Sequence, residues 1–375
     1  MPHHQVCGGF STMWPESWMG SVTGSLVSSS AFDDDWEQLE ADQQAEVPHV
    51  HQSMCQARFF LKHQCADDVK HSDFSGIDNR NLHRTFEVEA KPLASGGFGT
   101  VSRARLRTDN GVQRAVKAIP KKHRSTRRMV QNEVSILRTL DHPCICRLFE
   151  WFEEDSCFYL VMEYVDGQDL SDHIHQAKLL TEKFGVCVMR QVFEALHYCH
   201  GRNVVHRDLK PENIMLRKRA RKRAGAAVDE VEVKLIDFGL AACCYTSKLP
   251  AGQRPAAGFK VGTRSYAAPE VLLGNSEVDP ASDMWSAGMV LHALLLGCLP
   301  EEDKPANDEE TGLWLQHNHQ YANLSASAHE LIVALLQTDP QRRPTAGEAA
   351  AYDWLAEEVQ CITSEQVATL PRPVH

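Results

Sequence analysis

The sequence has neither a long apolar run nor a surplus of basic residues. A transmembrane helix needs about 20 consecutive apolar residues, and no such stretch occurs among the 375 positions, so we expect no membrane span. The 39 Lys and Arg residues are outnumbered by 50 Asp and Glu residues, which gives a formal net charge of −11. Because nucleic acids and anionic lipid surfaces attract basic proteins, we expect neither as the main partner.

Metal-ligand spacing and a secretory signal are also absent. Of the 12 cysteines, neither the pair Cys144 and Cys146 nor the pair Cys243 and Cys244 forms a C-x-x-C motif. The first residues (MPHHQVCGGF) show no basic segment followed by an apolar one. Free thiols are typical of a reducing compartment, so these features favour a cytoplasmic protein.

Residues 1–83 lack the periodicity of strands or helices. The first 85 residues hold twelve acids and five bases, which is −7 of the net −11. Such a composition is typical of disorder, and we expect a largely disordered extension. Trp14, Trp18 and Trp36 leave two interpretations open: scattered aromatics of a tail, which we favour, or contacts with the folded domain or a partner.

The rest of the chain has strand patterns first and helix patterns afterwards. This order predicts an α+β fold of two lobes, a small β-rich lobe followed by a larger helical lobe. We expect this domain at 84–357 and a C-terminal tail at 358–375. From the apolar periodicity, strands are expected at 86–88, 101–106, 113–119, 157–165 and 231–236, and helices at 130–137, from Thr181 onward, and at 283–297, 331–337 and 346–357.

The segment from His206 to Asn213 (HRDLKPEN) places an acid, a base and an amide close together. After the expected strand 231–236 comes the sequence Asp237-Phe238-Gly239. A carboxylate can orient a hydroxyl group and accept its proton, while other carboxylate and amide oxygens can hold Mg²⁺. Asp208 suits the first role, and Asn213 and Asp237 suit the second.

These two segments resemble the catalytic loop and the metal-binding loop of eukaryotic protein kinases. The resemblance covers about 86–355 and implies a bilobal fold, ATP and Mg²⁺ as cofactors, and protein substrates. It implies that Asp208 is the catalytic base and that Lys210 stabilises the transferred phosphoryl group. Lys210 is typical of the Ser/Thr-specific branch, as is Thr263, which would contact both residues. Asn213 and Asp237 would be the metal ligands.

The same resemblance implies a nucleotide site. The glycine-rich segment 94–101 would cover the phosphates with its backbone N–H groups, Lys117 would reach them with Glu133 as its partner, and 162–165 would be the hinge between the lobes. Ala94 stands where the family has its first glycine, and we expect this to weaken nucleotide binding modestly. The implied nucleotide-site residues are Ala94, Ser95, Gly96, Gly97, Phe98, Gly99, Val101, Ala115, Lys117, Glu133, Met162, Glu163, Val165 and Asp169.

Three residues outside the reaction centre are expected to support it. Asp283 lies on the buried helix that would anchor the catalytic loop, and Arg343 would pair with Glu270.

Asp169 has two interpretations of equal weight. It could contact the ribose or a basic substrate side chain, or it could be the N-cap of a helix. Thr246 and Ser247 are candidates for phosphorylation, which Arg207 could bind.

The segments 141–143 (DHP), 161–170 (VMEYVDGQDL) and 339–346 (DPQRRPTA) resemble those of calcium/calmodulin-dependent and calcium-dependent protein kinases. Several other features differ from that pattern. The sequence has no EF-hand loop, so we expect no built-in calcium-binding domain. A basic run at 217–225 is interpreted as a charged, soluble insertion, with a nuclear-localisation signal or acidic-partner patch as the alternative. Acidic Glu212 and Asp169 suggest substrates with basic residues upstream of the target Ser or Thr. The competing function is a pseudokinase that binds partners without phosphoryl transfer.

Overall fold

The computed structural model describes residues 81–97, 99–123, 125–177, 180–218, 231–244, 262–274, 278–297 and 307–356. All of these residues belong to the unit Lys70–His375, the second of two compact units. Several predictions lie outside the described residues: those for the extension up to residue 80, for Phe98, for the basic run from residue 219 onward, for Thr246 and Ser247, and for the tail 358–375.

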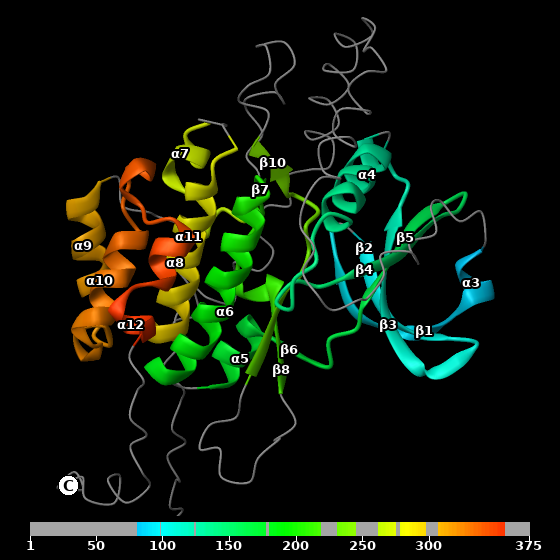
Figure 1. The fold of residues 1–375 in the computed structure, drawn as a ribbon, viewed down its shortest axis with the longest axis horizontal. Coiled ribbons are helices and arrows are strands. Elements are labelled where there is room, and N and C mark those ends of the chain that lie inside the picture. The colour runs from blue at the N-terminus through cyan, green and yellow to red at the C-terminus, as the bar shows by residue number, and fades with distance from the viewer. Residues whose placement is uncertain are drawn as a thin grey trace, which may run out of the picture. The chain divides into compact units, whose positions relative to one another are not determined.

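The small lobe is built on one antiparallel sheet of five strands in the order β1-β2-β3-β5-β4 (Figure 1). The predicted strands are present, but β1 is longer than its alternating start suggested and includes two register shifts before Ala94. A strand that the sequence did not predict, β4, forms one edge. The elements are β1 (Phe86–Gly96), β2 (Gly99–Leu106), β3 (Asp109–Pro120), α4 (Ser125–Leu137), β4 (Leu148–Glu153) and β5 (Cys157–Glu163).

The folded part begins before the predicted boundary at residue 84. Asn81 caps the short helix α3 (Leu82–Thr85) by accepting a hydrogen bond from the His83 N–H. The side chain of Leu82 is fully buried in a small cluster that includes Phe86 and Phe152. Burial of a leucine side chain is worth about 2 kcal/mol, so this turn is a part of the small lobe rather than of the extension.

The large lobe is mainly helical and surrounds α8, in which every residue from Asp283 to Leu296 is buried. Two small sheets lie beside these helices, β6-β8-β9 and β7-β10 (Figure 1). Together the two lobes confirm the predicted α+β bilobal fold. The elements are α5 (Leu170–Gln176), α6 (Glu182–Gly201), α7 (Pro269–Leu272), α8 (Pro280–Leu296), α9 (Asp308–Gln316), α10 (Ala326–Leu335), α11 (Ala346–Ala350), α12 (Asp353–Ala356), β6 (Gly167–Asp169), β7 (Val204–Val205), β8 (Ile214–Lys218), β9 (Val231–Leu235) and β10 (Ala242–Cys243).

Several predicted helix boundaries were wrong, and capping side chains explain two of them. Helix α10 begins at Ala326, earlier than predicted, because Ser325 accepts the Ala328 N–H as its N-cap. The expected helix 346–357 is two short helices. The first, α11, is fixed by a capping box between Thr345 and Glu348. Helix α9, in a polar region without an apolar stripe, was not predicted and is capped by Asn307.

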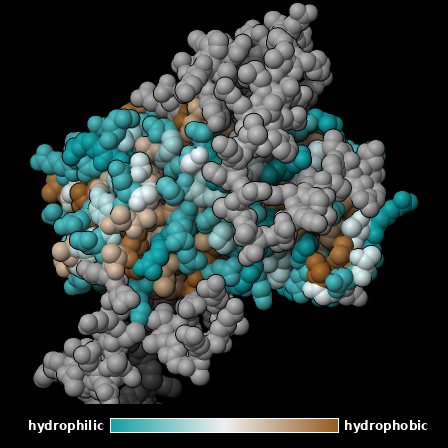
Figure 2. Space-filling view, in the orientation of Figure 1, coloured by the Kyte–Doolittle hydropathy of each residue, from teal (hydrophilic) through white to brown (hydrophobic). Residues whose placement is uncertain are grey.

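The described residues expose few large apolar side chains. The face in Figure 2 is mostly hydrophilic where the described residues are visible, with apolar residues in small separate spots. The large apolar side chains that are exposed come from different elements: Leu93, Leu273, Leu313 and Val333. Of the helices that the structure describes, none combines the length and the apolar character that a bilayer crossing requires.

Candidate active site

A buried lysine in the small lobe is bonded to two carboxylates, one of them from the large lobe. The Lys117 side chain on β3 donates hydrogen bonds to Glu133 on α4 (Nζ–Oε1, 2.9 Å) and to Asp237 (Nζ–Oδ1, 2.8 Å). Lys117 is 7% exposed and Glu133 is 3% exposed. The predicted pairing of Lys117 with Glu133 is therefore present, and the same ammonium group also holds the acid of the expected metal-binding loop.

Burial and pairing act in opposite directions on these three groups. Burial by itself would lower the pKa of Lys117, but Glu133 and Asp237 offset it, and the net shift is upward. Burial is the largest influence on Asp237 and would raise its pKa, yet the Lys117 ammonium holds that pKa below its ordinary value. The site therefore keeps a cation and an anion side by side at neutral pH.

A second cluster forms around Asp208, in the loop between β7 and β8. The Oδ1 atom of Asp208 accepts hydrogen bonds from the Thr263 N–H (2.8 Å) and from the Thr263 hydroxyl (2.9 Å). Its Oδ2 atom lies 3.2 Å from both Lys210 Nζ and Asn213 Nδ2. Lys210 Nζ also donates to the Thr263 hydroxyl (2.7 Å). The structure thus brings together the four residues that the sequence assigned to catalysis.

Asp283 of α8 binds the backbone of the catalytic loop, and its side chain is fully buried. Its carboxylate accepts hydrogen bonds from the N–H groups of His206 (2.8 Å) and Arg207 (2.9 Å) and from the His200 ring (2.9 Å). Burial alone would raise the pKa of Asp283, but the contact with His200 lowers it. Arg207 has a positive φ of 65°, a conformation that costs energy for a non-glycine residue. The hydrogen bonds from the His206 and Arg207 N–H groups to Asp283 offset this strain. Helix α8 therefore anchors the loop through Asp283, as predicted.

The metal-binding loop is also strained and supported. Asp237 has a φ of 59°, and its neighbour Phe238 is fully buried against the His206 ring, with ring centroids 4.7 Å apart. His206 also meets the Ile236 carbonyl oxygen at 3.1 Å. The expectation that His206 packs beneath this loop is confirmed. Asn132 of α4 donates to the carbonyl of Ala241 (2.9 Å), a tether that the sequence analysis missed.

The oxygen atoms of Asn213 and Asp237 suit Mg²⁺. Asn213 Nδ2 donates to the Asp208 carbonyl (2.8 Å), which leaves its Oδ1 for another partner. Asp237 uses Oδ1 for Lys117 and for the Gly239 N–H (3.3 Å), which leaves Oδ2. No group of three or more His, Cys, Asp or Glu side chains in the described part of the chain is arranged to hold a metal ion. Two protein oxygens fit an ion that keeps water and phosphate oxygens as its other ligands.

The glycine-rich segment forms the closed end of the β1–β2 hairpin. Ser95 pairs with Thr100 and Gly96 with Gly99 in the strand register, and Ala94 lies opposite Val101. Gly99 has a φ of 134°, and a Cβ atom there would lie 2.1 Å from the Ala118 carbonyl oxygen, so only glycine fits. A Cβ at Gly96 or Gly97 would meet no atom within 4 Å. That open space leaves the backbone accessible to a ligand.

The hinge differs from its prediction in detail. Strand β5 ends at Glu163, so Tyr164 and Val165 leave the sheet earlier than expected. Ala115 pairs with Met162 in the register of β3 and β5. Asp169 is the N-cap of α5, with Oδ1 accepting the Asp172 N–H at 2.7 Å. Of the two interpretations of Asp169, the structure confirms the helix cap, which uses Oδ1.

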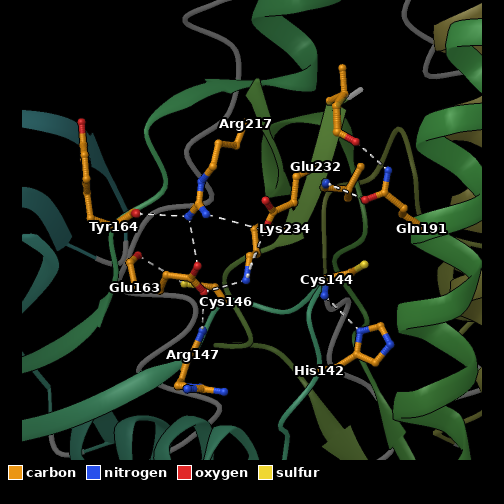
Figure 3. A network of polar contacts seen from close by, with 12 residues as sticks. His142, Cys144, Cys146, Arg147, Glu163, Tyr164, Gln191, Arg217, Glu232 and Lys234 are labelled. Carbon is orange, nitrogen blue, oxygen red and sulfur yellow. Dashed lines mark hydrogen bonds and ion pairs between the residues drawn. The ribbon is translucent and has the colours of Figure 1, made fainter. Parts of the chain in front are cut away.

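The first two residues of the basic run 217–225, which the sequence analysis interpreted as an insertion, belong to a strand. Arg217 and Lys218 are residues of β8 and pair with Glu232 and Val231 of β9. The guanidinium of Arg217 donates to the Glu163 carboxylate (3.0 Å), and Lys234 of β9 donates to the same carboxylate (2.9 Å; Figure 3). The sequence carried no signal for these contacts, because a lone Lys or Arg in a strand is normally a solvent-facing residue.

The segment 262–270 completes the site on the large-lobe side. It supplies Thr263 to Asp208 and ends at Glu270 in α7. Arg343 binds the Glu270 carboxylate with both terminal nitrogens (2.6 and 2.8 Å), a bidentate pair as predicted. Its guanidinium also lies 5.1 Å from the Trp285 ring centroid. This pair fixes the end of the segment against α8.

Comparison with known proteins identifies the family. Residues 88–355 match the family model described as "Protein kinase domain". This chain belongs to the protein kinase domain family. The match covers most of the two lobes and includes both loops around Asp208 and Asp237.

Three relatives illustrate what the chain is similar to. The chain is 33% identical to calcium-dependent protein kinase 5 of Plasmodium falciparum over 288 residues, which covers 74% of this chain and 46% of that protein. It is 35% identical to calcium/calmodulin-dependent protein kinase cmkA of Emericella nidulans over 273 residues (72% of this chain, 62% of that protein). Sperm motility kinase 3A of Mus musculus is 32% identical over 280 residues (75% and 51%). This chain therefore matches about half the length of such curated relatives.

Proposed function

We propose that this chain is a serine/threonine protein kinase that transfers the γ-phosphoryl group of ATP to Ser or Thr side chains of proteins. The observation that supports this most strongly is the convergence of Thr263, Lys210 and Asn213 on the carboxylate of Asp208. A carboxylate fixed on both oxygens by donors is oriented for one task and does not need to reorganise during the reaction.

In this proposal, Asp208 orients the substrate hydroxyl and accepts its proton. The bond formed is from the hydroxyl oxygen to phosphorus, the bond broken is from that phosphorus to the ADP oxygen, and the proton moves to Asp208. Lys210, which bridges Asp208 and Thr263 at 3.2 and 2.7 Å, places positive charge beside the reacting group. Thr263 fixes the position of both residues and so the place of the incoming hydroxyl.

Asn213 and Asp237 would hold Mg²⁺, and Lys117 would bind the phosphates. When bound, Mg²⁺ neutralises phosphate charge during transfer. Lys117 already carries its positive charge between Glu133 and Asp237, so the cation is in place before the nucleotide arrives. The glycine-rich hairpin, including Gly96 and Gly97, and the hinge with Met162 complete the nucleotide site in this proposal, with Ala115, Val101 and Val165 as the apolar lining.

The pseudokinase alternative is weaker. A pseudokinase would be expected to lack at least one member of the reaction centre, and Lys117, Asp208 and Asp237 are all present in bonded positions. Ala94 is the only departure from the motif that favours it. Ala94 pairs with Val101 as an ordinary strand residue, which is compatible with a working hairpin.

The substrates we propose are proteins with basic residues upstream of the target Ser or Thr. Glu212, within the catalytic loop, is exposed. Asp169 is half-buried, and one of its carboxylate oxygens caps α5. Both carboxylates could attract a cationic side chain. A cytoplasmic location, with nuclear entry as the alternative, stays a prediction from the sequence.

The proposal is tested by phosphoryl transfer with the purified full chain, Mg²⁺-ATP and a peptide panel. The panel contains Ser, Thr and Tyr acceptors, each with basic or acidic residues upstream. We expect transfer to Ser and Thr peptides and the highest rates with basic residues upstream. Transfer to Tyr peptides alone, or none to any peptide, would contradict the proposed function, and faster transfer to acidic peptides would contradict the substrate preference only.

A further inference from the structure

The side chain of the hinge residue Glu163 is enclosed by cations from the large lobe. Its Oε1 accepts a hydrogen bond from Arg217 of β8 (3.0 Å), and its Oε2 accepts one from Lys234 of β9 (2.9 Å) (Figure 3). Glu163 also pairs by its backbone N–H with the Arg147 carbonyl (2.8 Å). The last residue of β5 is therefore fixed through both its main chain and its side chain.

The next hinge residue, Tyr164, is held by two further arginine contacts. Arg217 donates to the Tyr164 carbonyl oxygen (3.4 Å) as well as to Glu163. On the small-lobe side, the Arg103 guanidinium lies 4.8 Å from the Tyr164 ring centroid, within the range of a cation–π interaction. The hinge thus carries contacts from β2 on one side and from the β8–β9 hairpin on the other.

The group consists of two cations, Arg217 and Lys234, and two acids, Glu163 and Glu232. Lys234 is 7% exposed, and besides Glu163 it has a more distant acid, Glu232 (3.9 Å). Arg217 also approaches Glu232 (3.6 Å). The Glu163 side chain is 20% exposed and accepts from one cation on each oxygen. Loss of Arg217 or Lys234 would therefore leave one Glu163 oxygen without its charged donor and hold the hinge less firmly.

We propose that Arg217 and Lys234 are positioning residues for the nucleotide site, because they fix the segment Glu163–Tyr164, part of the hinge that would bind the adenine of ATP in the proposed function. This inference rests on the proposed function. A hinge that is ordered before binding costs less ordering free energy when the nucleotide arrives. The two cations act through the hinge and touch neither the reacting phosphate nor Asp208, so they set nucleotide affinity and not the rate of the chemical step.

The test compares Arg217→Met with two matched variants of the full chain. Glu232→Gln removes an ion-pair partner of the same two cations without touching the hinge. Arg342→Met removes an arginine from an ion pair with Asp308, away from the hinge, and serves as the control. Mg²⁺-ATP affinity is measured by calorimetry, KM for ATP and kcat by peptide phosphorylation, and folding by thermal unfolding.

For Arg217→Met we expect roughly a five- to tenfold rise in the Kd and KM for ATP, as for the loss of one charged, preorganising hydrogen bond, with kcat within about twofold. Lys at this position (Arg217→Lys) should recover part of the affinity, since one ammonium can reach Glu163 but cannot bind two acceptors in a fork. Glu232→Gln and Arg342→Met should leave both constants near those of the native chain.

Two outcomes would overturn the inference while leaving the proposed function intact. One is a native chain that binds ATP and phosphorylates peptides while Arg217→Met has unchanged affinity. The other is an equal loss in Arg217→Met and Glu232→Gln, which would make the group a stabiliser of the β8–β9 hairpin only. If Arg217→Met proves unfolded, the same comparison is made with Arg217→Lys. Failure of the native chain to bind ATP would overturn both the inference and the proposed function.

Discussion

Two buried lysines, Lys117 in the small lobe and Lys234 in the large lobe, have almost the same surroundings. Each is 7% exposed, and each lies within 4 Å of two carboxylates. Lys117 meets Glu133 and Asp237 at 2.9 and 2.8 Å, and Lys234 meets Glu163 and Glu232 at 2.9 and 3.9 Å. The composition of an ion cluster therefore does not define its function.

The difference lies in what the carboxylates belong to. Asp237 is a residue with positive φ, in a loop that is strained and held by its neighbours, and strain of this kind concentrates at functional sites. Glu163 is the last residue of a regular strand. We infer that the first lysine serves the reaction directly and that the second serves it by holding the hinge.

The largest effect that would test this contrast is expected for Lys117→Met. Removal of the cation leaves Glu133 and Asp237 as neighbouring anions and takes away the group that would bind the phosphates. We expect kcat/KM for peptide phosphorylation to fall roughly 100-fold or more, as for the loss of one preorganised electrostatic contact. Lys234→Met is the matched change and should lower kcat/KM by less than tenfold. Equal losses in the two variants would break the contrast.

Within the catalytic cluster, Thr263→Val should have an intermediate effect. The change removes the hydroxyl that donates to Asp208 and accepts from Lys210 but keeps the shape of the side chain. We expect kcat to fall roughly tenfold, because misplacement of a catalytic carboxylate is costly, while the KM for ATP stays constant. Thr263→Ser retains the hydroxyl and should stay close to the native rate. A normal kcat for Thr263→Val would show that the Thr263 N–H alone holds Asp208.

His292 is a third buried basic side chain. Unlike Lys117 and Lys234, it has no acidic side chain that affects its pKa, so it shows the effect of burial alone. The ring lies in α8, stacked on Trp314 with centroids 4.6 Å apart, and its Nδ1 atom is buried without a hydrogen-bond partner. Burial lowers the pKa of His292 to about 4. This imidazole is therefore neutral in the folded protein near pH 7.

The sign of the resulting pH dependence follows from that shift. The unfolded chain takes up the His292 proton near pH 6.5, before the folded chain does, so the stabilising contribution is complete above that pH and is lost as the pH falls toward 4. Between pH 7.5 and pH 5 the loss should be about 2 kcal/mol. Urea unfolding of the native chain and of His292→Leu at both pH values measures it. A pH dependence that is the same in both proteins would contradict the assignment.

The residues that meet around Asp208 and Asp237 could be predicted from the sequence because each belongs to a short motif. Asp208, Lys210 and Asn213 share one loop, and Asp237 and Thr263 belong to two other segments. Asp283 of the neighbouring helix α8 fixes the backbone of the first loop, so the positions of its side chains follow from the order of the residues.

The hinge group could not be predicted, for physical reasons. Arg217 and Lys234 meet Glu163 across 54 and 71 positions of the sequence, and only the fold brings them together. Predicted helix boundaries were wrong where a capping side chain sets the first residue of the helix, as Ser325 does for α10 and Thr345 for α11. The short helix α3 was not predicted because only one of its side chains, Leu82, is buried, which leaves no apolar pattern in the sequence.

The most direct test of the account is Asp208→Asn, assayed for two properties of the same protein. The amide keeps the size of the side chain but cannot accept the substrate proton. We expect γ-phosphoryl transfer from ATP to a Ser peptide to fall roughly a thousandfold, with Mg²⁺-ATP affinity within about twofold of the native value. Transfer at the native rate by Asp208→Asn would contradict the proposed mechanism.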